Sequence, residues 1–188
     1  MKLNFGCAWD LKPKKESWIN ADKEDLDRIL ELREKHKGRD YGEFVYKRFD
    51  FDVFPYPFKD NAFNNVVVFH TLEHLDNIVK VMEELWRICK DKTVIEMTLP
   101  YFSGTLANTD PTYKHRFSYR TFEHFEQGTD YFDMLNKSNF KIVERKILFS
   151  EALSFLNFIP NLFPKVYERF FAYIFPSQSL YIKLKVVK

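Results

Sequence analysis

The sequence contains little cysteine, little glycine and no long apolar run. Its 188 residues include two cysteines, Cys7 and Cys89, and five glycines. Two widely spaced thiols form neither a disulfide framework nor a metal-ligand pattern, so we expect a reducing, cytoplasmic compartment and no metal. The beginning of the sequence lacks an apolar run of signal-peptide length, and no stretch reaches the roughly 18 apolar residues that a membrane span needs.

An excess of charge of one sign is also missing. The chain has 29 basic and 27 acidic residues, for a formal net charge of +2. This balance gives no electrostatic reason to expect nucleic acid as a partner. A hydrophobic fraction of 45% and a charged fraction of 30% are typical of a globular protein with a core. The length predicts one domain that spans residues 1–188.

Short apolar runs alternate with amphipathic segments along the chain. The runs predict strands at residues 2–6, 18–21, 44–51, 66–69, 93–99, 140–149 and 179–187. The segments between them predict helices at residues 24–36, 76–90, 121–136 and 151–175. Asp76 is the predicted N-cap of the second helix, and the link between the first two strands is too short for a full helix. This order predicts an α/β fold with a doubly wound, mostly parallel sheet and an antiparallel C-terminal edge strand.

Several residues with chemical potential follow the predicted strands, where open α/β sheets bind their ligands. The strand ends carry the turn Phe5-Gly6-Cys7-Ala8, then Asp22, Asp52 with Val53, His70, and Pro100 with Tyr101. Gly6 permits a tight turn and a close approach of a ligand to the backbone. Asp22 is suited to accept hydrogen bonds from both hydroxyls of a ribose, and Asp52 from an adenine amine, with Val53 or Phe54 against the face of the ring. The set predicts an adenosine site without a phosphate cradle.

These stretches resemble the class I S-adenosylmethionine (SAM) dependent methyltransferases, especially their small type 11 branch. The matching segments are Leu3-Asn4-Phe5-Gly6-Cys7-Ala8, Trp18-Ile19-Asn20-Ala21-Asp22, residues 52–63, and His70-Thr71-Leu72-Glu73-His74-Leu75. The resemblance is close over residues 2–100. It implies a Rossmann-like sheet of seven strands with a reversed last strand, and SAM as the cofactor. It further implies that the turn of residues 5–8 lies beside the methionine part of SAM, Asp22 at the ribose, Asp52 and Val53 near the adenine, and His70 at the floor of the site.

The first turn departs from the family pattern. Ala8 stands where the family has the second glycine of Gly-x-Gly, and the first crossover helix is missing. Two functions therefore stay open: an active SAM-dependent methyltransferase, and a methyltransferase-like domain that binds or scaffolds without catalysis. A nicotinamide dehydrogenase is disfavoured because the turn lacks the G-x-G-x-x-G spacing.

The chain after residue 100 is interpreted as the acceptor side. We expect residues 1–100 to form the cofactor-binding half and residues 101–188 to form an acceptor lid and an aromatic C-terminal part. The run Asp110-Pro111-Thr112 followed by His115-Arg116-Phe117 is similar to one in methyltransferases associated with cell-surface glycan synthesis. This similarity implies O-methylation of a small molecule or glycan intermediate. Tyr101, His115 and Arg116 are the expected substrate contacts.

A base is needed only where the acceptor must lose a proton. The candidates are His70, His74 and His115, because an unperturbed imidazole titrates in the required range. Each candidate also has a purely structural interpretation. Gly6 could end a strand, Asp22 and Asp52 could cap surface turns, and His70 could be a hydrogen-bonded core residue. Cys7 is interpreted as a packing residue, because nothing nearby would lower its pKa.

The aromatic segment of residues 155–175 also has two interpretations. It is either core or a protein interface, such as a homodimer contact, or else a peripheral membrane surface. In the second interpretation Lys165 and Arg169 would lie at the lipid headgroups.

Overall fold

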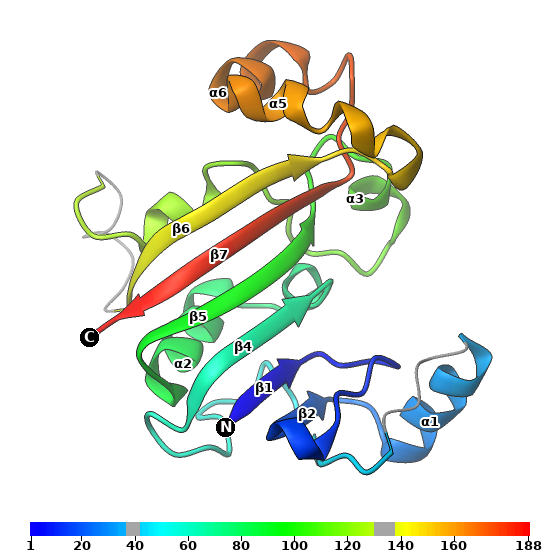
Figure 1. The fold of residues 1–188 in the computed structure, drawn as a ribbon, viewed down its shortest axis with the longest axis vertical. Coiled ribbons are helices and arrows are strands. Elements are labelled where there is room, and N and C mark those ends of the chain that lie inside the picture. Colours follow the sequence, from blue (N-terminus) through cyan, green and yellow to red (C-terminus); the bar gives the residue numbers. More distant parts are fainter. Residues whose placement is uncertain (37–41, 130–137) are drawn as a thin grey trace.

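A sheet of seven strands organises the molecule in the computed structural model, which describes residues 1–36, 42–129 and 138–188. The strands lie in the order β3-β2-β1-β4-β5-β7-β6 (Figure 1). They are β1 (Lys2–Phe5), β2 (Trp18–Asp22), β3 (Tyr46–Arg48), β4 (Phe63–Phe69), β5 (Cys89–Pro100), β6 (Asn139–Leu148) and β7 (Ser179–Val187). Strands β1 to β5 pair in parallel, and β7 is antiparallel to both β5 and β6. The predicted α/β fold with a reversed C-terminal strand is confirmed. The reversed strand lies beside β5 and leaves β6 at the edge.

The helices are short, and most lie close to the predicted positions. They are α1 (Leu26–Lys35), α2 (Ile78–Ile88), α3 (Leu106–Thr109), α5 (Phe158–Leu162) and α6 (Pro164–Val166), with single turns η1 (Lys14–Glu16), η2 (Leu72–His74), η3 (Thr121–Phe125), η4 (Glu151–Leu156) and η5 (Tyr167–Phe171). Only η1 lies between β1 and β2, as the short link predicted.

The predicted cap at Asp76 is wrong. Asn77 is the N-cap, because its side chain accepts the Lys80 N–H at 3.0 Å. Most of the second half of the helix predicted at 121–136 lies outside the described residues.

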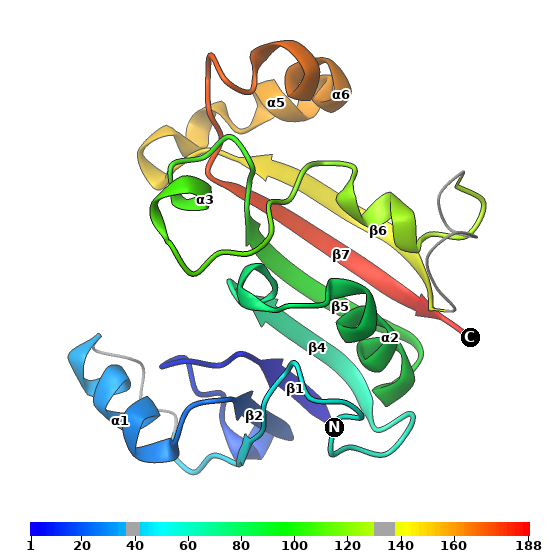
Figure 2. The same ribbon diagram turned by 180° about the vertical axis from the view of Figure 1, so that it is seen from behind.

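Helix α2 covers one face of the sheet. Figure 2 shows α2 over β4 and β5, and Figure 1 shows the opposite face of β4, β5, β7 and β6 with no helix of the described residues in front of it. The burial of β7 alternates accordingly, with Leu180, Ile182 and Leu184 buried and the residues between them partly exposed. Such alternation is typical of a sheet with one solvated face.

Aromatic rings fill the core below the end of β1. Phe5 stacks on Phe51 with ring centroids 4.0 Å apart, and Phe49 and Tyr56 pack against the same pair. The Tyr56 hydroxyl donates to the Phe51 carbonyl at 2.9 Å. This packing holds the loop after β3 against the end of β1, where the candidate site begins.

Candidate functional site

A cavity of about 700 Å³ lies at the carboxyl ends of β1, β2 and β4. Open α/β sheets bind their ligands at this edge. Its lining residues come from five segments of the chain: Asn4, Gly6, Cys7, Ala8, Trp9 and Asp10; Asp22 and Lys23; Phe51; Phe69, His70, Thr71, His74 and Leu75; and Asp110, Thr112 and Lys114 from the loop after β5. The cavity therefore joins the predicted cofactor turn to the predicted lid.

The turn after β1 requires glycine at position 6. Gly6 has a φ of +73°, and the N–H groups of Gly6 and Cys7 both donate to the Ala21 carbonyl, at 2.9 and 3.0 Å. A Cβ on Gly6 would lie 2.0 Å from Oγ1 of Thr71. The glycine thus serves both the backbone conformation and the close contact between the ends of β1 and β4.

Ala8 adopts a left-handed conformation without being glycine. Its φ is +39°, and its N–H donates to Oδ2 of Asp22 at 2.9 Å. Oδ1 of Asp22 accepts the N–H groups of Lys23 at 2.9 Å and Glu24 at 3.3 Å. A carboxylate offers about four acceptor positions, so about one position on Asp22 remains for a ligand. Asp22 therefore has capacity for one ribose hydroxyl after it has fixed the turn.

His70 is paired with a buried carboxylate. It has a φ of +48°, and its Nδ1 lies 3.2 Å from Oε1 of Glu73, whose side chain is fully buried. A carboxylate only accepts, so the pairing places the proton of a neutral His70 ring on Nδ1 and leaves Nε2 as an acceptor. The pairing with Glu73 therefore gives His70 the tautomer that a general base requires. The charge of Glu73 also acts on Tyr113, because that charge and burial together raise the pKa of the Tyr113 hydroxyl to about 12.

The loop after β5 is tied to the residues that follow β4. The Thr112 hydroxyl donates to Asp110 Oδ1 at 2.6 Å, so His74 Nδ1, at 2.8 Å, must be the donor to Thr112. Hydrogen bonds from the hydroxyl and N–H of Thr112 lower the pKa of Asp110. Lys114 Nζ lies 2.5 Å from Oδ1 of Asp76. These contacts hold the loop as one wall of the cavity.

Other predicted site residues lie outside the cavity lining. Asp52 accepts the N–H of Asp76 at 2.8 Å, and Val53 is 62% exposed. Tyr101 is fully buried and donates its hydroxyl to Glu168 at 2.9 Å. His115 and Arg116 also lie outside the lining set. Phe5 lies fully buried behind the turn.

Three predicted residues of the turn, Gly6, Cys7 and Ala8, are brought together with Asp22 and His70. Burial raises the pKa of the Cys7 thiol, so it is a packing residue and not a nucleophile. Sequence reasoning missed Phe51 as a lining residue. It placed Asp110, Thr112 and Lys114 in the acceptor lid but named other residues of that lid as the contacts. The spacing of Asp110 and Thr112, which is typical of a turn closed by an aspartate side chain, is a further signal for the first two.

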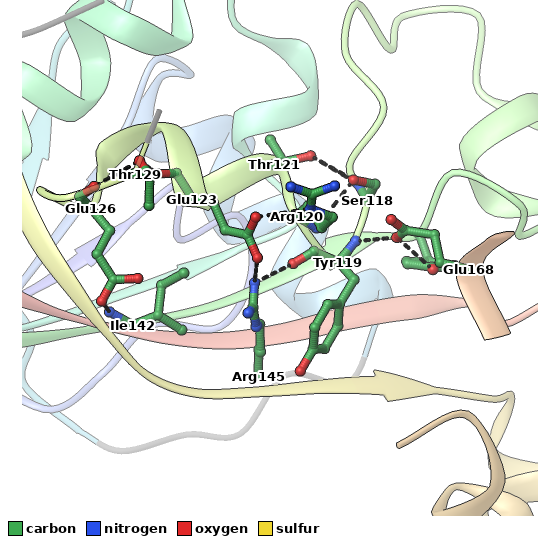
Figure 3. A network of polar contacts seen from close by, with 11 residues as sticks. Ser118, Tyr119, Arg120, Thr121, Glu123, Glu126, Thr129, Ile142, Arg145 and Glu168 are labelled. Carbon is green, nitrogen blue, oxygen red and sulfur yellow. Dashed lines mark hydrogen bonds and ion pairs between the residues drawn. The ribbon is translucent and has the colours of Figure 1, made fainter. Parts of the chain in front are cut away.

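A second polar cluster braces the chain beyond the lid loop (Figure 3). Glu123 binds Arg120 and Arg145, each at 2.9 Å, and Arg145 also donates to the Tyr119 carbonyl at 2.9 Å. Burial alone would raise the pKa of Glu123, but the two arginines lower it. Glu168 accepts the Tyr119 N–H at 2.6 Å. The cluster joins η3, β6 and η5 and acts as a structural support.

Comparison with known proteins finds this fold in SAM-dependent methyltransferases. Residues 20–95 match the family model of a methyltransferase domain. A SAM-dependent methyltransferase from Mesorhizobium loti is similar in structure, with a TM-score of 0.60, 11% identity, and coverage of 98% of this chain and 89% of that chain. A SAM-dependent methyltransferase from Archaeoglobus fulgidus gives a TM-score of 0.57 at 18% identity, over 98% and 85% of the two chains. The [4+2]-cyclase SpnF gives 0.62 at 12% identity, over 99% and 74%. A search of curated protein sequences finds no match.

These findings confirm the resemblance to class I methyltransferases and the predicted fold. The family match runs from β2 into β5, and it includes Asp22 and His70. The same findings support the predictions of a methyltransferase enzyme and of SAM as its cofactor.

Proposed function

We propose that this chain, a class I methyltransferase by its fold and its match to the methyltransferase-domain model, transfers a methyl group from SAM to a hydroxyl oxygen of a small molecule or glycan intermediate. One observation carries the proposal: a single cavity joins the turn of residues 6–8, Asp22, His70 and the lid loop. We treat residues 1–188 as one cytoplasmic domain, with the cofactor half at 1–100 and the acceptor lid and aromatic part at 101–188. The aromatic part adds a membrane contact or a homodimer contact.

The lining of the cavity fits the parts of SAM. The remaining acceptor position of Asp22 suits one ribose hydroxyl, and the apolar rings and chains of Phe51 and Leu75 suit the face of an adenine. The exposed backbone of the turn at residues 6–8 suits the amino-acid part. Phe51 takes the place that the sequence predicted for Val53, and Asp52 supports the wall from behind through the Asp76 N–H.

The chemistry of methyl transfer asks little of the protein beyond positioning and proton removal. When bound, SAM supplies an electrophilic methyl group and a thioether leaving group. His70 accepts the hydroxyl proton at Nε2, because its Nδ1 proton is held by Glu73 at 3.2 Å. With SAM held by Asp22 and the turn of residues 6–8, the acceptor oxygen would take the methyl group and the thioether would leave with the electron pair of the broken carbon–sulfur bond. Thr112 and His74 offer polar groups to a hydroxyl-rich acceptor.

Calorimetry with S-adenosylhomocysteine tests the cofactor site. We expect the protein to bind it, and Asp22→Asn to weaken binding about tenfold or more because a charge-assisted hydrogen bond is lost. Asp27→Asn, on the exposed face of α1, is the matched control and should leave the affinity unchanged. Absence of binding by the unaltered protein at millimolar ligand would refute the enzyme and leave the alternative of a non-catalytic binding domain.

Transfer of a labelled methyl group tests the acceptor class and the base. We expect label on hydroxyl groups in a panel of sugars, and His70→Gln should lower the rate about a hundredfold while S-adenosylhomocysteine still binds. Glu73→Gln should lower the rate less, since it disturbs only the tautomer. Label found only on amines or carboxylates would contradict O-methylation.

A further inference from the structure

The C-terminal segment of residues 149–178 exposes many large apolar side chains. Tyr173 is 80% exposed, Phe155 72% and Phe158 67%. The same segment also exposes Leu153, Ile159, Leu162, Phe163, Val166, Phe170, Phe171, Ile174 and Phe175. Soluble monomers rarely expose contiguous apolar patches of this kind, and those that do use them for contact with proteins, membranes or apolar ligands.

The segment also encloses an apolar cavity of about 740 Å³. Its walls are the rings and branched chains of η4, α5, α6 and η5, closed by Pro176 and Gln178. The polar side chains in its lining are Ser150, Tyr167 and Gln178, and the last two are hydrogen-bonded to other parts of the chain. The Gln178 side chain accepts the Thr105 hydroxyl at 3.1 Å, and the Tyr167 hydroxyl is bonded to Ser177 and to the Phe175 carbonyl. The cavity therefore suits an occupant without polar groups, such as an alkyl chain.

Polar contacts fix the inner side of the segment to the sheet. Glu168 is bonded to Tyr101 and Tyr119, as Figure 3 shows for the Tyr119 contact. Asn161 exchanges hydrogen bonds with both backbone groups of Ile147, at 2.9 and 2.7 Å, and Asn157 accepts the Phe149 N–H at 2.7 Å. The segment is thus already docked, and its exposed rings lie on a side that the described part of the chain leaves uncovered.

The segment carries two exposed cations, Lys165 and Arg169, and one exposed acid, Glu151, at its beginning. Lys165 and Arg169 are exposed, and neither forms an ion pair with an acid among the described residues. The acid between them, Glu168, is held on the inner side. Exposed aromatic and aliphatic chains with cations beside them match the interface of an anionic bilayer. A homodimer that placed Lys165 and Arg169 of one copy against those of the other would bring like charges together, which disfavours that arrangement.

The surface lies at the same end of the sheet as the cofactor cavity. Leu148 and Pro100, the last residues of β6 and β5, both pair with Ser179, the first residue of β7 (Figure 1).

No helix in the described ranges is long and apolar enough to cross a bilayer. We propose that residues 149–178 form an interfacial surface that binds anionic phospholipid membranes and takes an acyl chain into its apolar cavity. This binding goes beyond methyl transfer and does not depend on SAM.

Vesicle flotation tests the proposal. The purified protein should float with vesicles of phosphatidylcholine and phosphatidylglycerol, and much less with phosphatidylcholine alone. Phe158→Ser with Phe170→Ser should weaken binding about tenfold or more, and Lys165→Glu with Arg169→Glu should do the same by reversing the attraction. These side chains are exposed, so the variants should keep the circular dichroism and unfolding temperature of the parent.

Matched controls lie on the edge strand. Val143 is 54% exposed and Lys141 is exposed, both on β6, so Val143→Ser and Lys141→Glu should leave vesicle binding unchanged. Failure of the unaltered protein to float with anionic vesicles would overturn the proposal. An equal loss of binding in the control variants would also overturn it. A stable dimer that Phe158→Ser with Phe170→Ser converts to a monomer, without vesicle binding in either form, would assign the surface to a homodimer instead.

Discussion

Two cavities in the described part of the chain have similar volumes, about 700 and 740 Å³, and very different construction. The first lies at the carboxyl ends of β1, β2 and β4, and five segments distant in sequence contribute to it. Its polar side chains are bonded to one another and to backbone N–H groups. The second is formed by one continuous stretch of chain, is lined by apolar groups and is attached to the sheet at a few polar points.

The difference concerns where specificity comes from. The first cavity has a defined shape because backbone turns and long-range contacts fix it, and polar groups remain for one class of ligand. The second has few directional groups, so it can distinguish an apolar chain from water but hardly one such chain from another. Substitutions in the first cavity should therefore change the free energy of unfolding and the affinity for the cofactor together. Substitutions in the second should change membrane binding and the local order of residues 149–178.

The largest effect should come from Gly6→Ala. The new Cβ would lie 2.0 Å from Thr71 Oγ1, in a residue with a φ of +73°. We expect a loss of about 3 kcal/mol in the free energy of unfolding, from overpacking together with left-handed strain. Urea unfolding followed by circular dichroism measures it. Thr71→Ala should recover part of the loss in the double variant. Equal stability of Gly6→Ala and the parent would show that the turn is not fixed in this way.

Glu168→Ala should have the next largest effect, and a local one. It removes the acceptor of the fully buried Tyr101 hydroxyl and of the Tyr119 N–H. Leaving a buried donor without a partner costs about 1–3 kcal/mol. Hydrogen exchange should become faster in residues 149–178 while the turn at residues 6–8 keeps its protection. Tyr101→Phe, which removes only one donor, should show a smaller change. A uniform increase in exchange over the whole chain would contradict the separation of the two regions.

Local patterns were sufficient to predict most of the sheet and part of the site. Apolar runs located every strand, and the strand-end rule placed Gly6, Asp22 and His70 at one edge, because both depend on residues close in sequence. After β3, the residue that lines the cavity is Phe51, whereas the sequence predicted Asp52 and Val53. That strand ends at Arg48, and the stacking of Phe51 on Phe5 decides which residue reaches the cavity. Contacts of that kind are not visible in a local pattern.

The lid and the aromatic segment show the same limit. The loop after β5 was identified as the lid, but His115 and Arg116 were chosen where Thr112 and Lys114 line the cavity. Thr112 and Lys114 line the cavity because they contact His74 and Asp76, which lie far away in sequence. The sequence predicted helical structure at residues 151–175, and the structure has four short helical segments there. Pro160 and Pro164 lie within this stretch, and proline restricts the backbone and interrupts helices.

The smallest effect should come from Ala8→Gly, which restores the glycine that the family pattern contains. Glycine relieves the strain of a φ of +39°, but it also gives the unfolded chain more freedom. The two effects oppose each other, so the free energy of unfolding should change by about 0.5 kcal/mol or less. The Ala8 N–H bond to Asp22 does not need a side chain, so the affinity for S-adenosylhomocysteine should change less than about threefold. Thermal unfolding and calorimetry measure both quantities. A gain in affinity of about tenfold or more would show that the Ala8 methyl group obstructs the cofactor, and it would favour a natural role in which this cavity does not hold SAM.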